Sequence, residues 1–285
     1  MSTSIERKAP SSPPPQELVL EFLGLQVLGR AGTVEPRVRP VPAQVFLTVL
    51  GALGVSDAAG RAALNRMVTR GLLTRHKQGR TSAFSPTDVT VAMLDRGRRR
   101  MFSPTPFEQA DGGWTILNCP IPESLRNLRY QLHARLAWSG FGMAQANLWV
   151  APGRIDVEEL VGDFFPPDSL GLVQAFHGVP TPPTSPESLV PLAWDLKALR
   201  QAHLGFADRW TDEAPASPEE ALSRFLLLAE DWGRLLRTDP GLPASEPGED
   251  RPSVRSAQIF RRLDALLGPL AEERLRKLMP LETAS

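Results

Sequence analysis

Apolar residues recur at helical spacing in three successive stretches of the first third of the chain, Gln16–Gly29, Val41–Leu53 and Ser56–Gly71. This pattern predicts three helices, because a helix that packs on a core repeats its apolar positions every three to four residues. Ser56 is a good N-cap for the third helix, and Gly71 can adopt the left-handed conformation that ends a helix. The apolar stripe of the third helix consists of Leu64, Met67 and Val68.

Two short strands are predicted after the third helix, Leu72–Thr74 and Thr81–Phe84, with the basic segment His76–Arg80 between them. A glycine-containing connection of this length is typical of a hairpin. Two helices joined by a turn and followed by a basic hairpin indicate a winged helix-turn-helix domain, whose second helix enters the major groove of DNA. We expect this DNA-binding domain over residues 16–102, after a disordered tail of residues 1–15.

Polar residues of the third helix and of the hairpin are the candidate DNA contacts. Arg61, Asn65 and Thr69 are four residues apart, so they share one helix face and are expected to meet base edges. Cations beside this face or on the hairpin are expected to contact phosphates. These cations are Arg66, Arg70, Lys77 and Arg80. An arginine-bearing helix is more often only a solvated face, but the ordered set of cap, stripe, glycine and basic hairpin favours DNA binding.

The helix predicted over Pro86–Phe102 ends in the cluster Arg96–Arg100. Such a cluster is usually a solvated helix end that the helix dipole favours, with phosphate contact as the alternative. Prolines within residues 103–107 then indicate a linker.

A different pattern begins at residue 113. Residues 113–180 predict a strand, a helix, two strands, a helix and a strand, which is the order of a ferredoxin-like α+β sandwich. Residues 185–285 predict a helical C-terminal domain. Its helices are expected at Ser188–Trp210, Ser217–Thr238, Ser253–Leu267 and Leu270–Met279. We therefore expect an α+β protein of several domains.

The formal net charge of zero hides an uneven distribution. Residues 1–110 contain 15 lysines and arginines against 8 acidic residues, whereas residues 111–285 contain 17 against 24. This asymmetry indicates a basic module that faces nucleic acid, joined to an acidic one. Cys119 is the only cysteine, so no intrachain disulfide can form and the cytoplasm is the expected compartment. The scattered histidines show no ligand spacing, and no apolar run is long enough to span a membrane, so we expect neither a metal, a cofactor nor a membrane.

The three modules in this order resemble the PaaX-like transcriptional regulators, the repressors of phenylacetate degradation. In the first module the resemblance rests on Leu53–Ser56, Arg61, Leu64, Arg66, Arg70, Gly71, Leu73, Gly79 and Arg80. In the second it rests on Trp114, Pro120, Arg126, Leu132, Leu136, Trp138, Gly140–Gly142 and Trp149–Pro152. In the third it rests on Trp194–Leu196, Phe206, the helix of Trp232, and Asp239–Pro243.

The resemblance implies a homodimeric repressor on a near-palindromic double-stranded DNA operator, released by a small effector such as an aryl- or acyl-coenzyme A thioester. A coenzyme A ligand needs cations for its phosphates and an apolar slot for its acyl group. Arg126 and Arg129, on the predicted helix of the second module, are the candidate effector contacts. We expect the effector pocket to be built by the second and third modules.

Two other classes of function were weighed. The second module also resembles the small nuclease fold of the CRISPR adaptation machinery. That activity needs a metal-binding acid where this chain has Asn118 and Cys119, so an enzyme is not expected. Alternatively, the winged helix serves as a protein-docking platform without binding DNA.

Overall fold

A computed structural model describes residues 13–30, 38–79, 81–107, 113–121, 126–162, 165, 173–211, 217–242 and 251–279. The chain divides into two compact units. Unit 1 comprises Met1–Arg99, Ala214–Glu230 and Leu263–Ser285, and unit 2 comprises Arg100–Glu213 and Asp231–Arg262. Both contain helices and an antiparallel sheet, so the expected α+β class with several domains is confirmed. The expected boundaries 16–102, 113–180 and 185–285 stay predictions.

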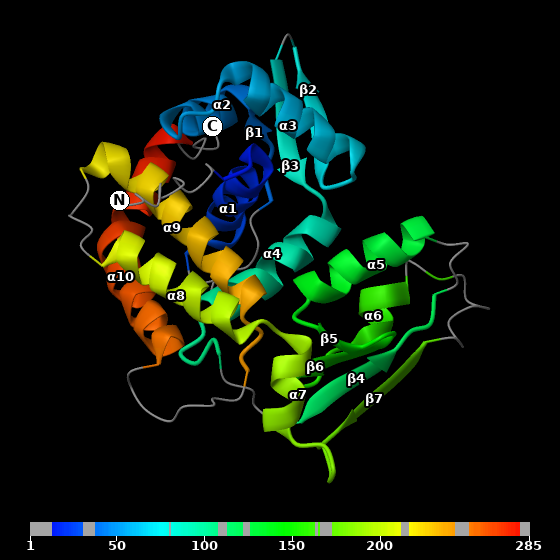
Figure 1. The fold of residues 1–285 in the computed structure, drawn as a ribbon. Helices are drawn as coiled ribbons and strands as arrows, with labels where there is room; N and C mark the ends of the chain where they lie inside the picture. The colour runs from blue at the N-terminus through cyan, green and yellow to red at the C-terminus, as the bar shows by residue number, and fades with distance from the viewer. Residues whose placement is uncertain are drawn as a thin grey trace, which may run out of the picture. The chain divides into compact units, whose positions relative to one another are not determined.

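Unit 1 begins with three helices and a small sheet (Figure 1). In chain order its elements are α1 (Pro15–Leu28), β1 (Val41–Pro42), α2 (Ala43–Ala52), α3 (Asp57–Thr69), β2 (Leu73–Gln78), β3 (Thr81–Pro86) and α4 (Asp88–Met101). The strand order is β1-β3-β2, with antiparallel neighbours. Phe46 of α2 contacts Phe22 of α1 and Phe84 of β3, with ring centroids 5.2 and 6.2 Å apart. These aromatic contacts join the helices to the sheet in one core.

The hairpin of unit 1 is longer in its strands and shorter in its turn than the sequence predicts. Gln78 pairs with Thr81, so β2 and β3 are two residues apart in the sequence, and Lys77 lies within β2 instead of in a loop. Gly79 has a φ of 59°, the left-handed conformation that a two-residue hairpin turn requires. Arg80 itself lies outside the described residues.

The sheet of unit 2 has the strand order β5-β6-β4-β7, with every neighbouring pair antiparallel. The elements are β4 (Trp114–Asn118), α5 (Arg126–Trp138), β5 (Gly142–Gln145), β6 (Leu148–Pro152), α6 (Val157–Val161), β7 (Gln174–Gly178), α7 (Pro186–Ala193) and α8 (Leu196–Trp210). The predicted order of strand, helix, two strands, helix and strand is therefore present. Helices α5 and α6 cover one face of this sheet, and α7 covers the opposite face (Figure 1). Side chains of the helices form a separate apolar core with each face.

The single helix predicted over Ser188–Trp210 is wrong. Trp194 adopts an extended conformation between α7 and α8, and Asp195 caps α8 by accepting a hydrogen bond from the backbone N–H of Ala198 at 2.9 Å. The apolar spacing continues through this break, which is why periodicity alone did not detect it.

Two long helices each contribute to both units, α9 (Pro218–Thr238) and α10 (Pro252–Leu278). At the start of α9, Glu220 accepts a hydrogen bond from the backbone N–H of Ser217 at 3.3 Å, which is half of a capping box. The two separate helices predicted at Ser253–Leu267 and Leu270–Met279 are wrong, because α10 runs through Pro269. Buried residues keep their helical spacing on both sides of this proline, so packing outweighs the lost hydrogen bond. They are Leu263, Leu267, Ala271 and Leu275.

The arginine cluster at the end of α4 is not simply a solvated helix end. Arg98 is only 3% exposed and lies against Gly24 of α1, where a Cβ atom would come within 3.2 Å of its Nε. Burial lowers the pKa of Arg98, and the charges of Glu21, Asp264 and Glu272 oppose this change. The expectation of a solvated or phosphate-binding group is therefore wrong for Arg98, whereas Arg96 and Arg99 are exposed as expected.

Candidate nucleic-acid interface and ligand pocket

Helix α3 is held against α2 by a close approach of the two helices. The predicted N-cap is present, because the hydroxyl of Ser56 accepts a hydrogen bond from the backbone N–H of Ala59 at 3.3 Å. A Cβ atom on Gly60 would lie 2.8 Å from a side-chain atom of Leu47, so any larger residue would require the Leu47 side chain to shift. The chain leaves α3 at Gly71, whose φ is 71°. These contacts fix which face of α3 is buried.

The opposite face of α3 is polar and open. All five of its predicted contact residues are exposed: Arg61, Asn65, Arg66, Thr69 and Arg70. Arg61 forms an exposed ion pair with Asp57, at 4.0 Å, which contributes little to stability. The Thr69 hydroxyl donates to the backbone carbonyl of Asn65 at 3.2 Å, and Arg70 donates to the side chain of Gln16 at 3.3 Å. The structure thus brings the five together on one surface.

The hairpin adds a cation that the sequence analysis missed. The guanidinium of Arg75, on β2, donates a hydrogen bond to the side-chain oxygen of Asn65 and lies 5.5 Å from the ring centroid of Phe84. Arg75 therefore links the hairpin to the exposed face of α3. The alternation of side chains along β2 was the only sequence signal that could have placed Arg75 beside α3. The strand was predicted to end before Arg75, so this signal was not used. Lys77 is exposed further along the same strand.

Two threonines at the start of α4 hold the hairpin and α3 together. The hydroxyl of Thr87 donates to the backbone carbonyl of Gly71 at 2.9 Å, and that of Thr90 donates to the carbonyl of Leu72 at 2.8 Å. Thr90 is fully buried. These hydrogen bonds satisfy the carbonyls of the two residues that connect α3 to β2, so the face of α3 and the hairpin keep a defined geometry.

Unit 2 contains a cavity of about 600 Å³. It is lined by Ala137, Gly140, Phe141, Gly142, Met143, Trp149, Ala193, Trp194, Asp195, Ala198, Leu199, Arg234, Arg237 and Thr238. Ala137–Trp149 come from the second predicted module and Ala193–Thr238 from the third. That an effector pocket is built by these two modules stays a prediction.

The predicted effector residues do not line this cavity. Arg126 and Arg129 lie on α5, whose residue Ala137 does line it. Arg126 lies eleven positions before Ala137, a distance of about 16 Å along the axis at the usual rise of an α-helix. Arg126 is exposed and Arg129 is half-buried. Their contact with an effector stays a prediction.

The end of β4 has the chemistry of a structural strand and not of a metal site. The Asn118 side chain donates to that of Gln174 on β7 at 3.2 Å. Cys119 is 3% exposed, and burial raises the pKa of its thiol to about 11, so it stays protonated at neutral pH. Among the described residues, no three of His, Cys, Asp or Glu cluster in a way that could hold a metal ion. Within the same residues, no helix has the length and apolar character needed to cross a membrane.

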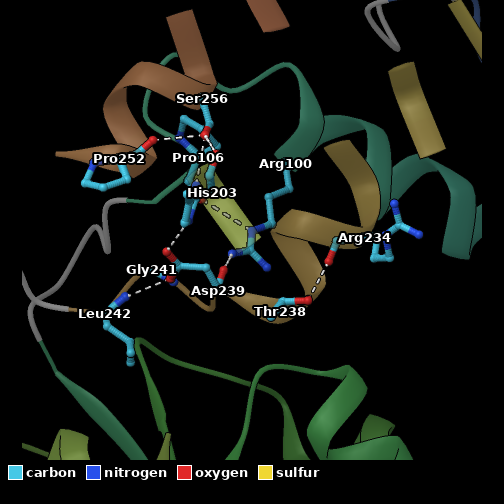
Figure 2. A network of polar contacts seen from close by, with 10 residues as sticks. All are labelled: Arg100, Pro106, His203, Arg234, Thr238, Asp239, Gly241, Leu242, Pro252 and Ser256. Carbon is cyan, nitrogen blue, oxygen red and sulfur yellow. Dashed lines mark hydrogen bonds and ion pairs between the residues drawn. The ribbon is translucent and has the colours of Figure 1, made fainter. Parts of the chain in front are cut away.

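A buried network in unit 2 contains the residue types of a hydrolase triad. His203 Nδ1 lies 3.1 Å from the hydroxyl of Ser256, and His203 Nε2 lies 3.0 Å from a carboxylate oxygen of Asp239 (Figure 2). The Ser256 hydroxyl is fully buried and donates to the carbonyl of Pro252 at 2.9 Å. A nucleophile needs access to its substrate, so this arrangement is structural. No sequence signal joined these three residues.

Asp239 also organises the chain that follows α9. Its second carboxylate oxygen accepts hydrogen bonds from the backbone N–H groups of Gly241 and Leu242, at 2.9 and 3.4 Å (Figure 2). Its backbone carbonyl accepts one from Arg100 at 2.7 Å. Burial alone would raise the pKa of Asp239, but the hydrogen bonds from His203 and Gly241 lower it below the usual value.

Comparisons with known proteins bear on this architecture. An uncharacterized protein from Mycobacterium tuberculosis, Rv0674, has a similar fold, with a TM-score of 0.53 and 20% sequence identity over 90% of this chain and 99% of that one. A comparison with curated proteins gave no match. Three family models match in order: PaaX-like protein at residues 26–90, PaaX protein central Cas2-like domain at 108–189, and PaaX-like protein C-terminal domain at 194–277. The chain therefore belongs to the PaaX-like family.

Proposed function

We propose that this protein is a transcriptional regulator that binds double-stranded DNA through α3 and the β2–β3 hairpin. The observation that carries the proposal is the exposed polar face of α3, with five candidate contacts beside a basic hairpin. The order of helices and strands in unit 1 supports a winged helix-turn-helix domain, and the sheet order in unit 2 supports a ferredoxin-like sandwich. Membership of a family of regulators supports the same reading.

The two parts of this surface have different tasks. Arg61, Asn65 and Thr69 would meet base edges in the major groove, because they share the exposed face of α3. The remaining cations would fix the position of the protein along the DNA by contacting phosphates, which carry no sequence information themselves. These are Arg66, Arg70, Lys77 and Arg80.

We further propose that the protein is a cytoplasmic repressor that acts as a homodimer on a near-palindromic operator. Two-fold symmetry of the protein would match the symmetry of such a site. An aryl- or acyl-coenzyme A thioester would release it from DNA, with Arg126 and Arg129 of α5 as the contacts for the effector. By linkage, the effector and the operator would then weaken each other's binding by the same factor.

The direct test is binding of the purified protein to the DNA upstream of its own gene, measured by footprinting at physiological salt. A protected near-palindromic site is expected, and phenylacetyl-coenzyme A should reduce the protection. Absence of any DNA binding would reject the proposal and favour the alternative of protein docking. Protection that no thioester changes would reject only the effector part.

The hairpin offers a prediction about salt dependence. Lys77→Ala should weaken binding to operator and non-operator DNA alike, and should reduce the slope of log K against log salt by about one. The reason is that an exposed lysine on β2 releases one counterion when it meets a phosphate. Lys197→Ala, an exposed lysine on α8 of unit 2, is the matched control and should leave the slope unchanged. An unchanged slope with Lys77→Ala, accompanied by lost specificity, would show that the hairpin reads bases instead.

Asn65 offers a prediction about base readout. Asn65→Ala should relax the preference at one base pair of each half-site by about 1–3 kcal/mol. In the free protein the Asn65 side-chain oxygen accepts a hydrogen bond from Arg75, so Arg75→Ala should leave the base preference in place and alter mainly the affinity. Binding to a panel of single-base variants measures both effects. A variant profile identical to that of the parent protein would remove Asn65 from the readout.

A further inference from the structure

We propose that Thr87 and Thr90, at the start of α4, are positioning residues for DNA binding, because they hold the β2–β3 hairpin in a fixed position relative to α3. The inference rests on the proposed function, in which α3 meets base edges while the hairpin meets phosphates of the same site. Both sets of contacts form together without a further ordering cost when their relative geometry is set before binding. Neither threonine is among the candidate DNA contacts.

The two threonines lie where four segments of unit 1 meet. Only residues 70–72 separate α3 from β2, and only Thr87 separates β3 from α4 (Figure 1). Leu73 pairs with Pro86, so the ladder of the hairpin begins directly at this point. A change in the angle between α3 and the hairpin therefore requires movement of these few connecting residues.

The connection from α3 to β2 is held on both sides of its peptide groups. The N–H groups of Gly71 and Leu72 donate to carbonyls of the last turn of α3, at 3.0 and 2.9 Å, which is a Schellman turn. The carbonyl of Gly71 accepts from the Thr87 hydroxyl at 2.9 Å. The carbonyl of Leu72 accepts from the Thr90 hydroxyl at 2.8 Å and from the backbone N–H of Thr87 at 3.2 Å. The start of α4 therefore holds the residues at which the hairpin would pivot.

Helix α4 is itself fixed in unit 1. Thr90 is fully buried, and its backbone N–H donates to the Thr87 hydroxyl at 3.4 Å, which caps the helix. Further along α4, Arg98 is buried against Gly24 of α1. The hydroxyls of the two threonines thus tie the hairpin to an element that the core of unit 1 holds in place.

A second link joins the hairpin to α3 at the exposed surface. The guanidinium of Arg75 donates a hydrogen bond to the side chain of Asn65. Both residues are exposed, so water competes for this hydrogen bond, whereas the hydroxyl of Thr90 is shielded from such competition. The hairpin should therefore lose its position when Thr90 is changed and keep it when Arg75 is changed.

The test compares operator binding by Thr90→Val and by the parent protein over a range of salt concentrations. Valine keeps the shape of threonine and removes the hydroxyl. The operator affinity should fall by about three- to tenfold, and the slope of log K against log salt should fall by about one, because the hairpin no longer meets its phosphate. Adding Lys77→Ala to Thr90→Val should then have little further effect. Thr90→Ser keeps the hydroxyl and should bind as the parent does.

Thr115→Val is the matched control. Thr115 is a buried threonine of unit 2, and its hydroxyl donates to the backbone carbonyl of Gly153 at 2.7 Å. The substitution removes the same kind of hydrogen bond away from α3 and the hairpin, so the salt slope should stay that of the parent. Melting curves show whether the variants are folded. Where Thr90→Val does not fold, the half-buried Thr87→Val tests the same junction by the same salt slope.

A measurement without DNA tests the junction independently of the proposed function. Spin labels on Asp57→Cys of α3 and Thr81→Cys of β3 occupy exposed positions, and the native Cys119 is buried. The distance distribution between the two labels should be narrow in the otherwise unchanged protein and broader with Thr90→Val added.

Three results would overturn the inference: a folded Thr90→Val with the salt slope of the parent, a Thr90→Ser that binds as weakly as Thr90→Val, or a label distance distribution that Thr90→Val leaves unchanged. If the parent protein binds no DNA, the proposed function fails, and the spin labels still decide whether Thr90 holds the hairpin. The two failures are therefore distinguishable.

Discussion

Arg98→Met is expected to destabilise the protein by about 3–5 kcal/mol at neutral pH, because removing one partner of a buried charge cluster leaves the others uncompensated. Arg98 is buried in unit 1, where Glu21, Asp264 and Glu272 carry the opposing charges. Methionine retains most of the apolar length of arginine, so the loss is mainly electrostatic. Urea denaturation measures the difference in the free energy of unfolding.

The same substitution should have a characteristic pH dependence. Burial raises the pKa of Asp264, Glu272 raises it further, and the charges of Arg30 and Arg98 oppose the rise. A carboxyl group whose pKa is higher in the folded state than in the unfolded chain favours folding when protonated and loses that contribution as the pH rises. Without Arg98 the pKa of Asp264 should rise further. The penalty of Arg98→Met should therefore be smaller near pH 4.5 than at pH 7, since more of Asp264 is then protonated.

Arg99→Met is the matched control, because the neighbouring arginine is exposed and forms only a surface ion pair with Asp95. It should change the free energy of unfolding by roughly 0.5 kcal/mol or less. Equal effects of the two substitutions at neutral pH would contradict the role assigned to Arg98.

The parts of the fold that the sequence predicted correctly depend on short-range signals. The Ser56 cap, the Gly71 stop and the buried Leu64 of α3 all follow from residues within one or two helical turns of each other. The DNA-facing candidates were predicted by the same means, since a helix with one buried face must expose the other. Their place on the exposed face of α3 needed no knowledge of distant contacts.

The remaining features depend on partners far apart in the sequence. Arg98 looked like part of a solvated cluster because Asp264 and Glu272 are more than 160 residues away. The apolar repeat continues on both sides of Asp195, so it gives no sign of the break between α7 and α8. The only sequence signal for this break is Asp195 itself, which caps α8. The cavity of unit 2 combines residues from three separate segments, and its arginines on α9 resemble any exposed pair on a helix. Such arrangements are properties of the tertiary structure and leave no local pattern.

Asp239→Ala is expected to destabilise unit 2 by about 3–5 kcal/mol, because it leaves three buried or partly buried donors without their acceptor. These donors are the backbone N–H groups of Gly241 and Leu242 and the ring of His203.

The penalty of Asp239→Ala should also decrease at acidic pH, but for a different reason from that of Arg98→Met. The pKa of Asp239 is lower in the folded protein than the usual aspartate pKa of about 3.8. The ionised carboxylate therefore stabilises the fold fully above pH 3.8, and this stabilisation is lost as the pH falls through the lower pKa of the folded state. The penalty of Asp239→Ala should accordingly stay constant from neutral pH down to about pH 5 and shrink only at more acidic pH.

Two further variants separate the hydrogen bonds of Asp239 from its charge. Asp239→Asn keeps an oxygen for Gly241 and Leu242, and His203 can adopt the tautomer that accepts from the new amide and donates to Ser256. Its destabilisation should therefore be clearly smaller than that of Asp239→Ala. Asp208→Ala, on the exposed face of α8, should be nearly neutral, at roughly 0.5 kcal/mol or less. If Asp239→Asn were as damaging as Asp239→Ala, the negative charge of Asp239 would matter more than its hydrogen bonds, which would contradict this assignment.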